Sequence, residues 1–335
     1  MFDVITIGSI TRDNFLEGDF PIVKSPTAPS GKAIFLPFGE KLEVKKVYST
    51  IGGNSANASV TFARQGFKTA CFGKVGDDLS GKEIAEKLKK EKVRPLFTVS
   101  KNRPTAYSVL LLEKGERTIL GYHGASDTMR LRDIPWKNLK AKWWYLSLAG
   151  ESDKFLKPLL NFAKKNNIKV AFNPSGHHIK HKRNEILSSL KDISFLVLNE
   201  SEAADLVGIP FKNEKAVFKK LDKLMPGIVA VTDGPNGVTV SDGEYLYKAG
   251  IFKEQKVVDR TGAGDAFGSG FVAGLLKSQK SKIKSQKEVI SYAIRLASAN
   301  ATSVVEQAGA TEGILTNKQF ESARWKNLKI NVKEL

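Results

Sequence analysis

The amino-acid sequence predicts an α/β fold: a doubly wound, mostly parallel β-sheet flanked by helices on both faces. Residues 2–8 form a nearly continuous apolar run, which is typical of a strand buried on both sides in a parallel sheet. From residue 141 onward, apolar strand-like segments alternate with helix-like ones, as in parallel strands joined by right-handed crossovers. Around residue 262, a strand turns over three small residues into an apolar helix, and open α/β sheets bind ligands at such strand ends.

Length and composition indicate a globular protein with one large domain and room for a small appendage. The 335 residues are 41% hydrophobic and 26% charged, and no apolar run approaches the roughly 20 residues that a membrane span needs. Cys71 is the only cysteine, which excludes internal disulfides and suits a reducing compartment. The first residues read as a strand rather than a signal peptide, so we expect a cytoplasmic protein with no membrane partner.

The chain is strongly basic, with a formal net charge of +18. Such a charge can mark a nucleic-acid-binding protein, which is one alternative for this sequence. The lysines are dispersed in pairs along what look like exposed helix faces, however, and no basic tail or patch interleaved with aromatic residues is present. We therefore expect no specific nucleic-acid partner, although a positive field would attract a nucleoside triphosphate.

Two segments, 14–50 and 94–122, differ from the rest in pattern. They contain short runs that alternate apolar and polar residues, which predicts half-buried strands outside the main sheet. We expect these segments to form a small projecting β-sheet, and residues 1–13, 51–93 and 123–335 to form the α/β core.

The second half of the chain supplies most of the predicted core. We expect strands at 143–148, 169–173, 194–198 and 228–232, and helices at 154–166, 186–190, 214–224 and, as the final helix, 289–305. His177, His178 and His181 fall in a basic segment that we expect to be a loop. A metal site is not expected there, because no nearby carboxylate completes it and a pair of His four residues apart needs a helix.

The turn at residues 262–264 is the strongest candidate site. Gly262, Ala263 and Gly264 have almost no side chain, so an anion can approach the N–H groups that a helix start leaves unpaired. Asp265 follows directly, and a carboxylate beside an anion cradle suits phosphoryl transfer, because it can accept the proton of the attacking hydroxyl. The alternative is that Asp265 caps the helix and the glycines serve close packing.

Two polar segments near the N-terminus are candidates to bind a polyol. Gly52 and Gly53 let the backbone approach a ligand, and Asn54 and Asn57, three residues apart, share one face at a helix start. An Asn-capped helix is the alternative. Asp13 lies in the polar segment after the first strand, where it can bind a ligand or serve as a turn residue.

Further along the chain, Asn199 and Glu202 lie at another predicted helix start. They can be aimed together at a hydrated Mg²⁺, and a capping box fits the same spacing equally well. Residues 76–83 match a P-loop except at the last position, where Glu83 replaces the Ser or Thr that would hold Mg²⁺. We interpret them as a loop into a helix at 81–91.

Two strings carry a family resemblance. Asp-x-Thr-Gly-Ala-Gly-Asp-Ala-Phe, beginning at Asp259, resembles the C-terminal signature of the PfkB-type carbohydrate kinase family, also called ribokinase-like. Residues 51–81 resemble the N-terminal signature of the same family, in the right order along the chain. The resemblance implies a ribokinase-like fold whose small β-sheet is a lid over the sugar site and a possible homodimer surface. Tyr107 and Tyr122 of that lid are then candidates to face the substrate, and lid core is the alternative.

The resemblance also implies roles for the candidate residues. Asp265 would be the catalytic base, and the backbone of Gly262, Ala263 and Gly264 would form the anion hole for the γ-phosphate of ATP. The implied acceptor site consists of Asp13, Thr11, Gly52, Gly53, Asn54 and Asn57. The implied nucleotide site consists of Asn199, Thr232, Gly234, Gly237, Ala308 and Gly309. Glu202 would bind Mg²⁺ through water, and Asp259 and Thr261 would bind K⁺.

The implied function is an ATP-dependent kinase that phosphorylates a primary hydroxyl of a sugar. A nucleoside kinase of the adenosine kinase type is an alternative, and a non-catalytic sugar or nucleotide sensor is another. Ser298 stands where ribokinase-type sequences have Asn, so the sequence leaves the acceptor open.

Overall fold

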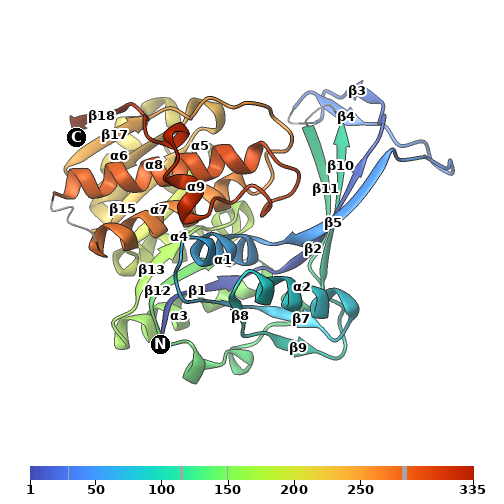
Figure 1. Ribbon diagram of the computed structural model, residues 1–335, viewed down its shortest axis with the longest axis horizontal. Helices are drawn as coiled ribbons and strands as arrows, with labels where there is room; N and C mark the ends of the chain where they lie inside the picture. The colour runs from blue at the N-terminus through green and yellow to red at the C-terminus, as the bar shows by residue number, and fades with distance from the viewer. Residues whose placement is uncertain (29, 114–115, 149, 281–284) are drawn as a thin grey trace.

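The computed structural model describes residues 1–28, 30–113, 116–148, 150–280 and 285–335. An α/β body contains both termini, and a narrow β-sheet projects from one side of it (Figure 1). Among the described residues, no helix has both the length and the apolar character that crossing a membrane requires.

The main sheet confirms the predicted α/β class. Within the described residues it has ten strands, and the pairs among its first seven strands in chain order are parallel, whereas the last three strands pair antiparallel. The spatial order is β18 (Ile330–Glu334), β17 (Tyr245–Ala249), β16 (Val238–Ser241), β15 (Ile228–Thr232), β14 (Phe195–Asn199), β13 (Lys169–Phe172), β12 (Ala141–Ser147), β1 (Phe2–Gly8), β6 (Thr69–Phe72) and β8 (Val93–Pro95).

Helices cover both faces of this sheet, so the sheet is doubly wound. Alternation along β1 sends Val4 to one face and Ile5 to the other, and each of the two side chains belongs to a separate buried cluster. The first face carries α1 (Asn54–Arg64), α7 (Ala263–Lys280) and α8 (Gln286–Val305); the second carries α3 (Leu156–Lys165), α4 (Gly176–Ser189), α5 (Glu200–Val207) and α6 (Glu214–Leu224).

Glycines bring α7 and α8 into close contact, and the two helices lie side by side on the near face in Figure 1. A Cβ atom on Gly274 would lie 2.5 Å from the Cα of Ala293, and one on Gly270 would lie 2.9 Å from the Cα of Ala297. The two backbones therefore touch where a side chain cannot fit, which fixes the position of the first turn of α7.

The projecting sheet, here called the lid, has the order β11 (Glu116–Tyr122), β10 (Ala106–Glu113), β2 (Thr11–Glu17) and β5 (Lys46–Gly52). Strand β2 follows β1 after two residues, so the lid begins where the central strand of the core ends. A hairpin of β3 (Ile22–Lys24) and β4 (Lys32–Ile34) extends it. Strand β8 belongs to the main sheet, and β9 (Thr98–Ser100) pairs with β7 (Lys74–Gly76) beside the core.

Tyr107 and Tyr122 do not lie on the lid face that would let them contact the substrate. Asp13 pairs with Ser108 on β10, and side chains alternate along a strand, so Tyr107 and its partner Tyr122 point to the face opposite Asp13. Both tyrosines are exposed. They do not face the candidate substrate site, and the aromatic residues that share the face of Asp13 are Tyr48 and the buried Phe15.

Two further expectations about secondary structure are wrong. The three histidines lie in α4 and not in a loop, because Ser175 caps a helix there by accepting a hydrogen bond from the backbone N–H of His178. Helix 289–305 is not the last element, since α9 (Asn317–Phe320) and β18 follow.

His177, His178 and His181 all lie on α4. No group of three or more His, Cys, Asp or Glu in the part of the chain that the structure describes could hold a metal ion. Burial lowers the pKa of His178 to about 4, so this ring stays neutral near pH 7.

The P-loop-like segment also behaves as interpreted. Helix α2 (Leu79–Lys90) begins there, and Asp78 caps it by accepting a hydrogen bond from the backbone N–H of Gly81 at 2.8 Å. Asp78 also accepts from the hydroxyl of Thr105 at 2.6 Å, so its carboxylate is already occupied.

Candidate active site

Asp265 lies in the first turn of α7 and is 8% exposed. Its Oδ2 accepts a hydrogen bond of 3.0 Å from the side-chain amide of Asn57, which α1 brings against α7. Burial is the largest cause that raises the pKa of Asp265, the hydrogen bond from Asn57 lowers it, and the charges of Asp13 and Glu202 raise it; together they bring the pKa to about 6. The carboxylate is therefore ionised at neutral pH yet basic enough to accept a proton.

Asp13 is the second buried carboxylate, and it lies on β2 just past the end of the central strand. Its Oδ1 accepts a hydrogen bond of 2.7 Å from the hydroxyl of Thr11. Burial raises the pKa of Asp13, while hydrogen bonds from Thr11 and Ser108 lower it. Gly52 is required beside it, because a Cβ at this position would lie 1.9 Å from Asp13 Oδ2.

The Gly52–Gly53 pair leads into α1 in a strained conformation that glycine allows. Gly53 has φ 87°, and a Cβ on it would lie 2.6 Å from the backbone oxygen of Ser9. The hydroxyl of Ser9 accepts the N–H of Asn54, so the first turn does not depend on an Asn cap. Asn57 is 4% exposed, and its Oδ1 has no partner among the described residues, so a ligand hydroxyl can donate to it.

The turn before Asp265 is shaped as an anion cradle. Gly262 has φ 79°, and a Cβ on it would lie 2.5 Å from that of Ala310, so glycine is required. The N–H of Ala263 makes a long turn contact of 3.4 Å to the carbonyl of Arg260. Around Gly264, by contrast, a Cβ would meet nothing within 4 Å, so the space in front of the helix start is open. The positive end of the helix dipole points at this space.

Asp259 lies behind the cradle and is 2% exposed. Its Oδ1 accepts hydrogen bonds from the backbone N–H and the hydroxyl of Thr261, at 2.8 and 2.7 Å. Its Oδ2 is buried and has no partner among the described residues. A buried carboxylate oxygen without a donor is costly, and a cation is one group that would satisfy it.

Asn199 and Glu202 form the capping box that the sequence left as an alternative. The backbone N–H of Glu202 donates to Asn199 Oδ1, and the N–H of Asn199 donates to Glu202 Oε2, both at 2.9 Å. The box uses one carboxylate oxygen of Glu202. The charge of Glu202 nevertheless acts on Asp265, so the two carboxylates share one region.

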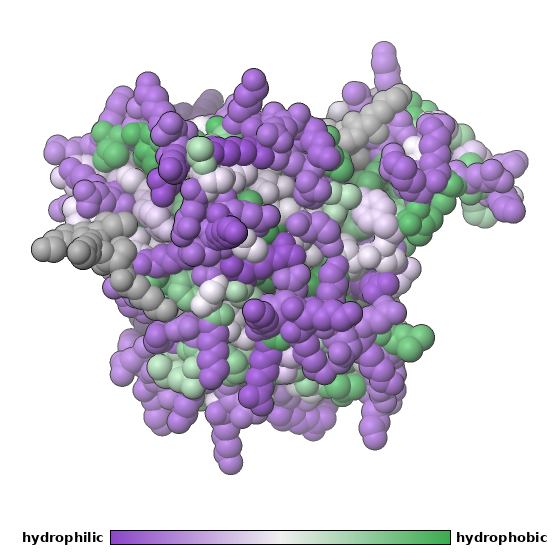
Figure 2. All heavy atoms as spheres, viewed as in Figure 1, coloured by the Kyte–Doolittle hydropathy of each residue, from purple (hydrophilic) through white to green (hydrophobic). Residues whose placement is uncertain are grey.

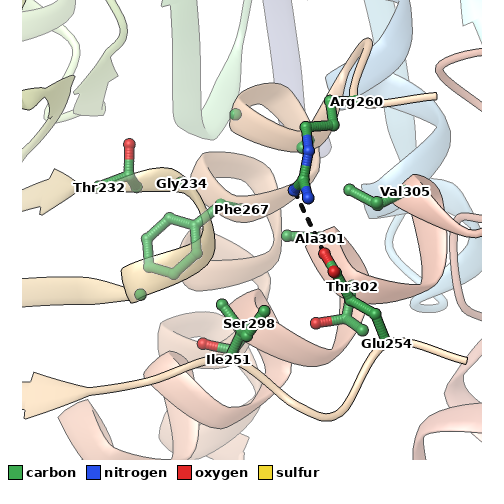
Figure 3. A pocket seen from close by; sticks show the side chains of 13 residues that line it. Thr232, Gly234, Ile251, Glu254, Arg260, Phe267, Ser298, Ala301, Thr302 and Val305 are labelled. Atoms are coloured by element: carbon green, nitrogen blue, oxygen red, sulfur yellow. Dashed lines mark hydrogen bonds and ion pairs between the residues drawn. The ribbon is translucent and has the colours of Figure 1, made fainter. Parts of the chain in front are cut away.

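A pocket of about 190 Å³ opens beside the cradle (Figure 3). It brings Thr232, Gly234 and Gly237, from the turn after β15, together with Gly264. Ala308 and Gly309 are not among its lining residues. The complete lining is Thr232, Gly234, Gly237, Ile251, Glu254, Arg260, Ala263, Gly264, Phe267, Ser298, Ala301, Thr302 and Val305.

Sequence reasoning assigned no role to seven of these residues: Ile251, Glu254, Arg260, Phe267, Ala301, Thr302 and Val305. A signal existed for two of them, because Arg260 and Phe267 flank the cradle within the signature string.

Tyr48 was also missed. Its ring stacks on Phe15 at 4.7 Å between centroids, on the lid face that carries Asp13. Burial and the charge of Asp259 raise the pKa of Tyr48 to about 12, so its hydroxyl lies near the candidate site.

Comparisons with known proteins identify the family of this chain. The model of the pfkB family of carbohydrate kinases matches residues 28–317. The ribokinase of Haemophilus influenzae is 30% identical over 297 residues, covering 84% of this chain and 89% of its own, and the adenosine kinase of Saccharomyces cerevisiae is 27% identical over 291 residues, covering 82% and 85%. The structure of Arabidopsis thaliana ribokinase complexed with ribose and ATP superposes with a TM-score of 0.73 at 26% identity, covering 97% of this chain and 99% of that one. Since the family model matches most of its length, the chain belongs to the pfkB family of carbohydrate kinases.

Proposed function

We propose that the protein transfers the γ-phosphoryl group of ATP to a primary hydroxyl of a sugar. The observation that carries the proposal is the position of Asp265. It is a buried carboxylate with a raised pKa, bonded to Asn57, and it follows directly on the cradle that borders the pocket.

The proposed step uses the chain's own groups in three roles. Asp265 takes the proton of the acceptor hydroxyl, whose oxygen forms a bond to the γ-phosphorus. The bond from that phosphorus to the β–γ bridging oxygen breaks, and ADP leaves. The first-turn amides of α7, from Gly262 to Gly264, hold the negative charge of the transferring group.

The acceptor site is proposed from the polar groups around Asp265. Asp13, with Thr11 bonded to it, accepts hydrogen bonds from sugar hydroxyls, and the unpartnered Oδ1 of Asn57 accepts another. Gly52, Gly53 and Asn54 keep the backbone close to the ligand.

A nucleoside is the second candidate acceptor, and one observation favours it. The ring of Tyr48 is partly exposed on the lid face of Asp13, where it stacks on the buried Phe15, and an aromatic ring in this position can pack against a base.

Two cations fit residues of the site. Glu202 keeps Oε1 outside its capping box, which suits contact with Mg²⁺ through water near Asn199, and Mg²⁺ would neutralise phosphate charge. The unpartnered Oδ2 of Asp259, next to Thr261, suits K⁺, with carbonyls from Ala308 and Gly309. Thr232, Gly234 and Gly237 would hold the adenosine part of ATP.

The compartment and the assembly of the chain are also part of the proposal. The lone cysteine is free and buried, in keeping with a cytoplasmic protein. Val47 and Leu120 are 61% and 55% exposed on the lid face away from Asp13, and Figure 2 shows hydrophobic side chains on the lid among hydrophilic ones. These side chains suit a homodimer through the lid, which sedimentation equilibrium would detect as a doubled mass.

A screen of ADP release across pentoses, hexoses, sugar phosphates and nucleosides tests the function and the acceptor together. We expect turnover with one class, and loss of about 10²- to 10⁴-fold in Asp265→Asn with ATP binding retained. Undiminished turnover in that variant would refute the assigned base. Wild-type protein that binds ATP but releases ADP with no acceptor class would favour the sensor.

A further inference from the structure

The donor pocket contains an ion pair. Among its described lining residues, two are charged: Glu254, from the segment after β17, and Arg260, from the turn before α7. Arg260 donates from a guanidinium nitrogen to Glu254 Oε1 at 3.2 Å. Figure 3 shows both side chains reaching toward each other along one side of the pocket, with Phe267 on the other.

Arg260 is placed at the phosphate end of this pocket by its backbone. Its carbonyl accepts the N–H of Ala263, so it is the first residue of the turn that opens α7. Its neighbour Asp259 is buried behind the cradle, whereas the side chain of Arg260 extends into the pocket (Figure 3). The guanidinium therefore projects from the same turn whose amides form the cradle.

The chemistry of the pair favours an exchange of partners. A guanidinium offers five donors in a plane and binds phosphate oxygens in pairs, more strongly than it binds a single carboxylate oxygen. The side chains of Arg260 and Glu254 are 37% and 19% exposed, and ion pairs at such positions are weak. Glu254 supplies the guanidinium with one negative charge, and a nucleoside diphosphate or triphosphate supplies several.

We propose that Arg260 is a nucleotide-binding residue that leaves Glu254 to contact the non-transferred phosphates of the donor. Glu254 holds the guanidinium inside the pocket until the nucleotide enters. This inference rests on the proposed function, because it takes the pocket as the donor site.

Binding of ADP and of adenosine, measured by calorimetry on the full chain, separates the phosphate contact from the rest of the pocket. We expect Arg260→Gln to weaken ADP binding about 10- to 100-fold and to change adenosine binding less than twofold. Glu254→Gln should bind ADP as tightly as wild type or several-fold tighter, because no ion pair must break first. Arg94→Gln is the matched control: it removes the same charge from exposed β8 and should bind both ligands like wild type.

Other results would overturn the inference. Equal losses for ADP and adenosine in Arg260→Gln, or a lowered melting temperature in that variant, would make the pair a structural element of the pocket wall. Unchanged ADP binding would show that Arg260 does not reach the phosphates. If wild-type protein binds no ADP, the proposed function is contradicted. If wild type binds ADP and Arg260→Gln binds it equally well, only the role of Arg260 is contradicted.

Discussion

At the scale of single residues, the proposed base is Asp265, and its burial and the neighbouring Asp13 and Asn57 determine its proton affinity. Burial accounts for most of the rise in the pKa of Asp265, and Asp13 and Asn57 act on it in opposite directions. Because the base must be ionised, activity should rise with pH through about 6.

This opposition predicts two shifts in the pH profile. Asp13→Asn removes a negative charge, so the pKa of Asp265 falls and the acidic limb of kcat/KM moves to lower pH. Asn57→Ala removes the hydrogen bond that stabilises the carboxylate, so the limb moves to higher pH. Both variants should also raise the KM of the acceptor. If the acidic limb moves in the same direction in both variants, or in neither, a group other than Asp265 controls kcat/KM at acidic pH.

The same pKa predicts a cost in stability. Asp265 binds its proton more tightly in the folded state than in the unfolded chain, so folding is favoured at low pH and this advantage is lost as pH rises from about 4 to about 6. The difference between 3.8 and about 6 corresponds to roughly 3 kcal/mol. Chemical denaturation of wild type and Asp265→Asn should give similar free energies of unfolding at pH 4 and a more stable variant by up to that amount at pH 8. A constant difference across this range would contradict the raised pKa.

At the scale of elements, two glycines of α7 differ in their surroundings: Gly274 packs against α8, whereas Gly264 faces open space. Gly274 meets the backbone of α8, so Gly274→Ala should destabilise the protein by about 1–3 kcal/mol while leaving the site's groups unchanged. Around Gly264 a Cβ meets nothing, and Ala favours a helix over Gly by about 1 kcal/mol.

We therefore expect Gly264→Ala to fold at least as stably as wild type but to lose at least tenfold in kcat/KM for ATP, because the methyl group occupies the approach to the amides. Thermal unfolding and steady-state kinetics of the two variants should give opposite rankings. If Gly264→Ala keeps full activity, the anion does not bind in front of this turn.

The elements also show where sequence interpretation stops. The helix at Ala263 and the strands β1, β12, β13, β14 and β15 were predictable, because their apolar runs and glycine turns are local signals. The face of the lid on which Tyr107 lies could not be predicted. A shift of one residue in strand register moves every side chain to the opposite face, and the sequence alone does not specify the register. The first part of α4 was missed, although a helix was predicted at 186–190, because its cap, Ser175, precedes a run of basic residues without apolar periodicity. The pairing of Arg260 with Glu254 joins a loop to a turn, and such contacts appear only when the chain is folded.

At the scale of the whole molecule, the formal net charge is +18, and hydrophilic side chains are spread over the face of the body shown in Figure 2. A dispersed charge still creates a positive field, and salt screens it over about 10 Å at 0.1 M ionic strength. ATP carries several negative charges and a sugar carries none, so the field acts on one substrate alone.

This difference predicts how the two substrates respond to salt. Raising NaCl from about 0.05 to 0.5 M, with K⁺ and Mg²⁺ held constant, should weaken ADP binding about tenfold and leave the KM of a neutral acceptor at saturating ATP nearly unchanged. The phosphate contact proposed for Arg260 adds to this result, because salt also screens the guanidinium from the phosphates. Arg260→Gln lacks that contact, so it should show a shallower salt dependence than Arg94→Gln although both carry the same net charge. Identical slopes in the two variants would assign the whole effect to the distributed charge, and equal losses for ADP and the sugar would mean that salt acts on the fold rather than on the field.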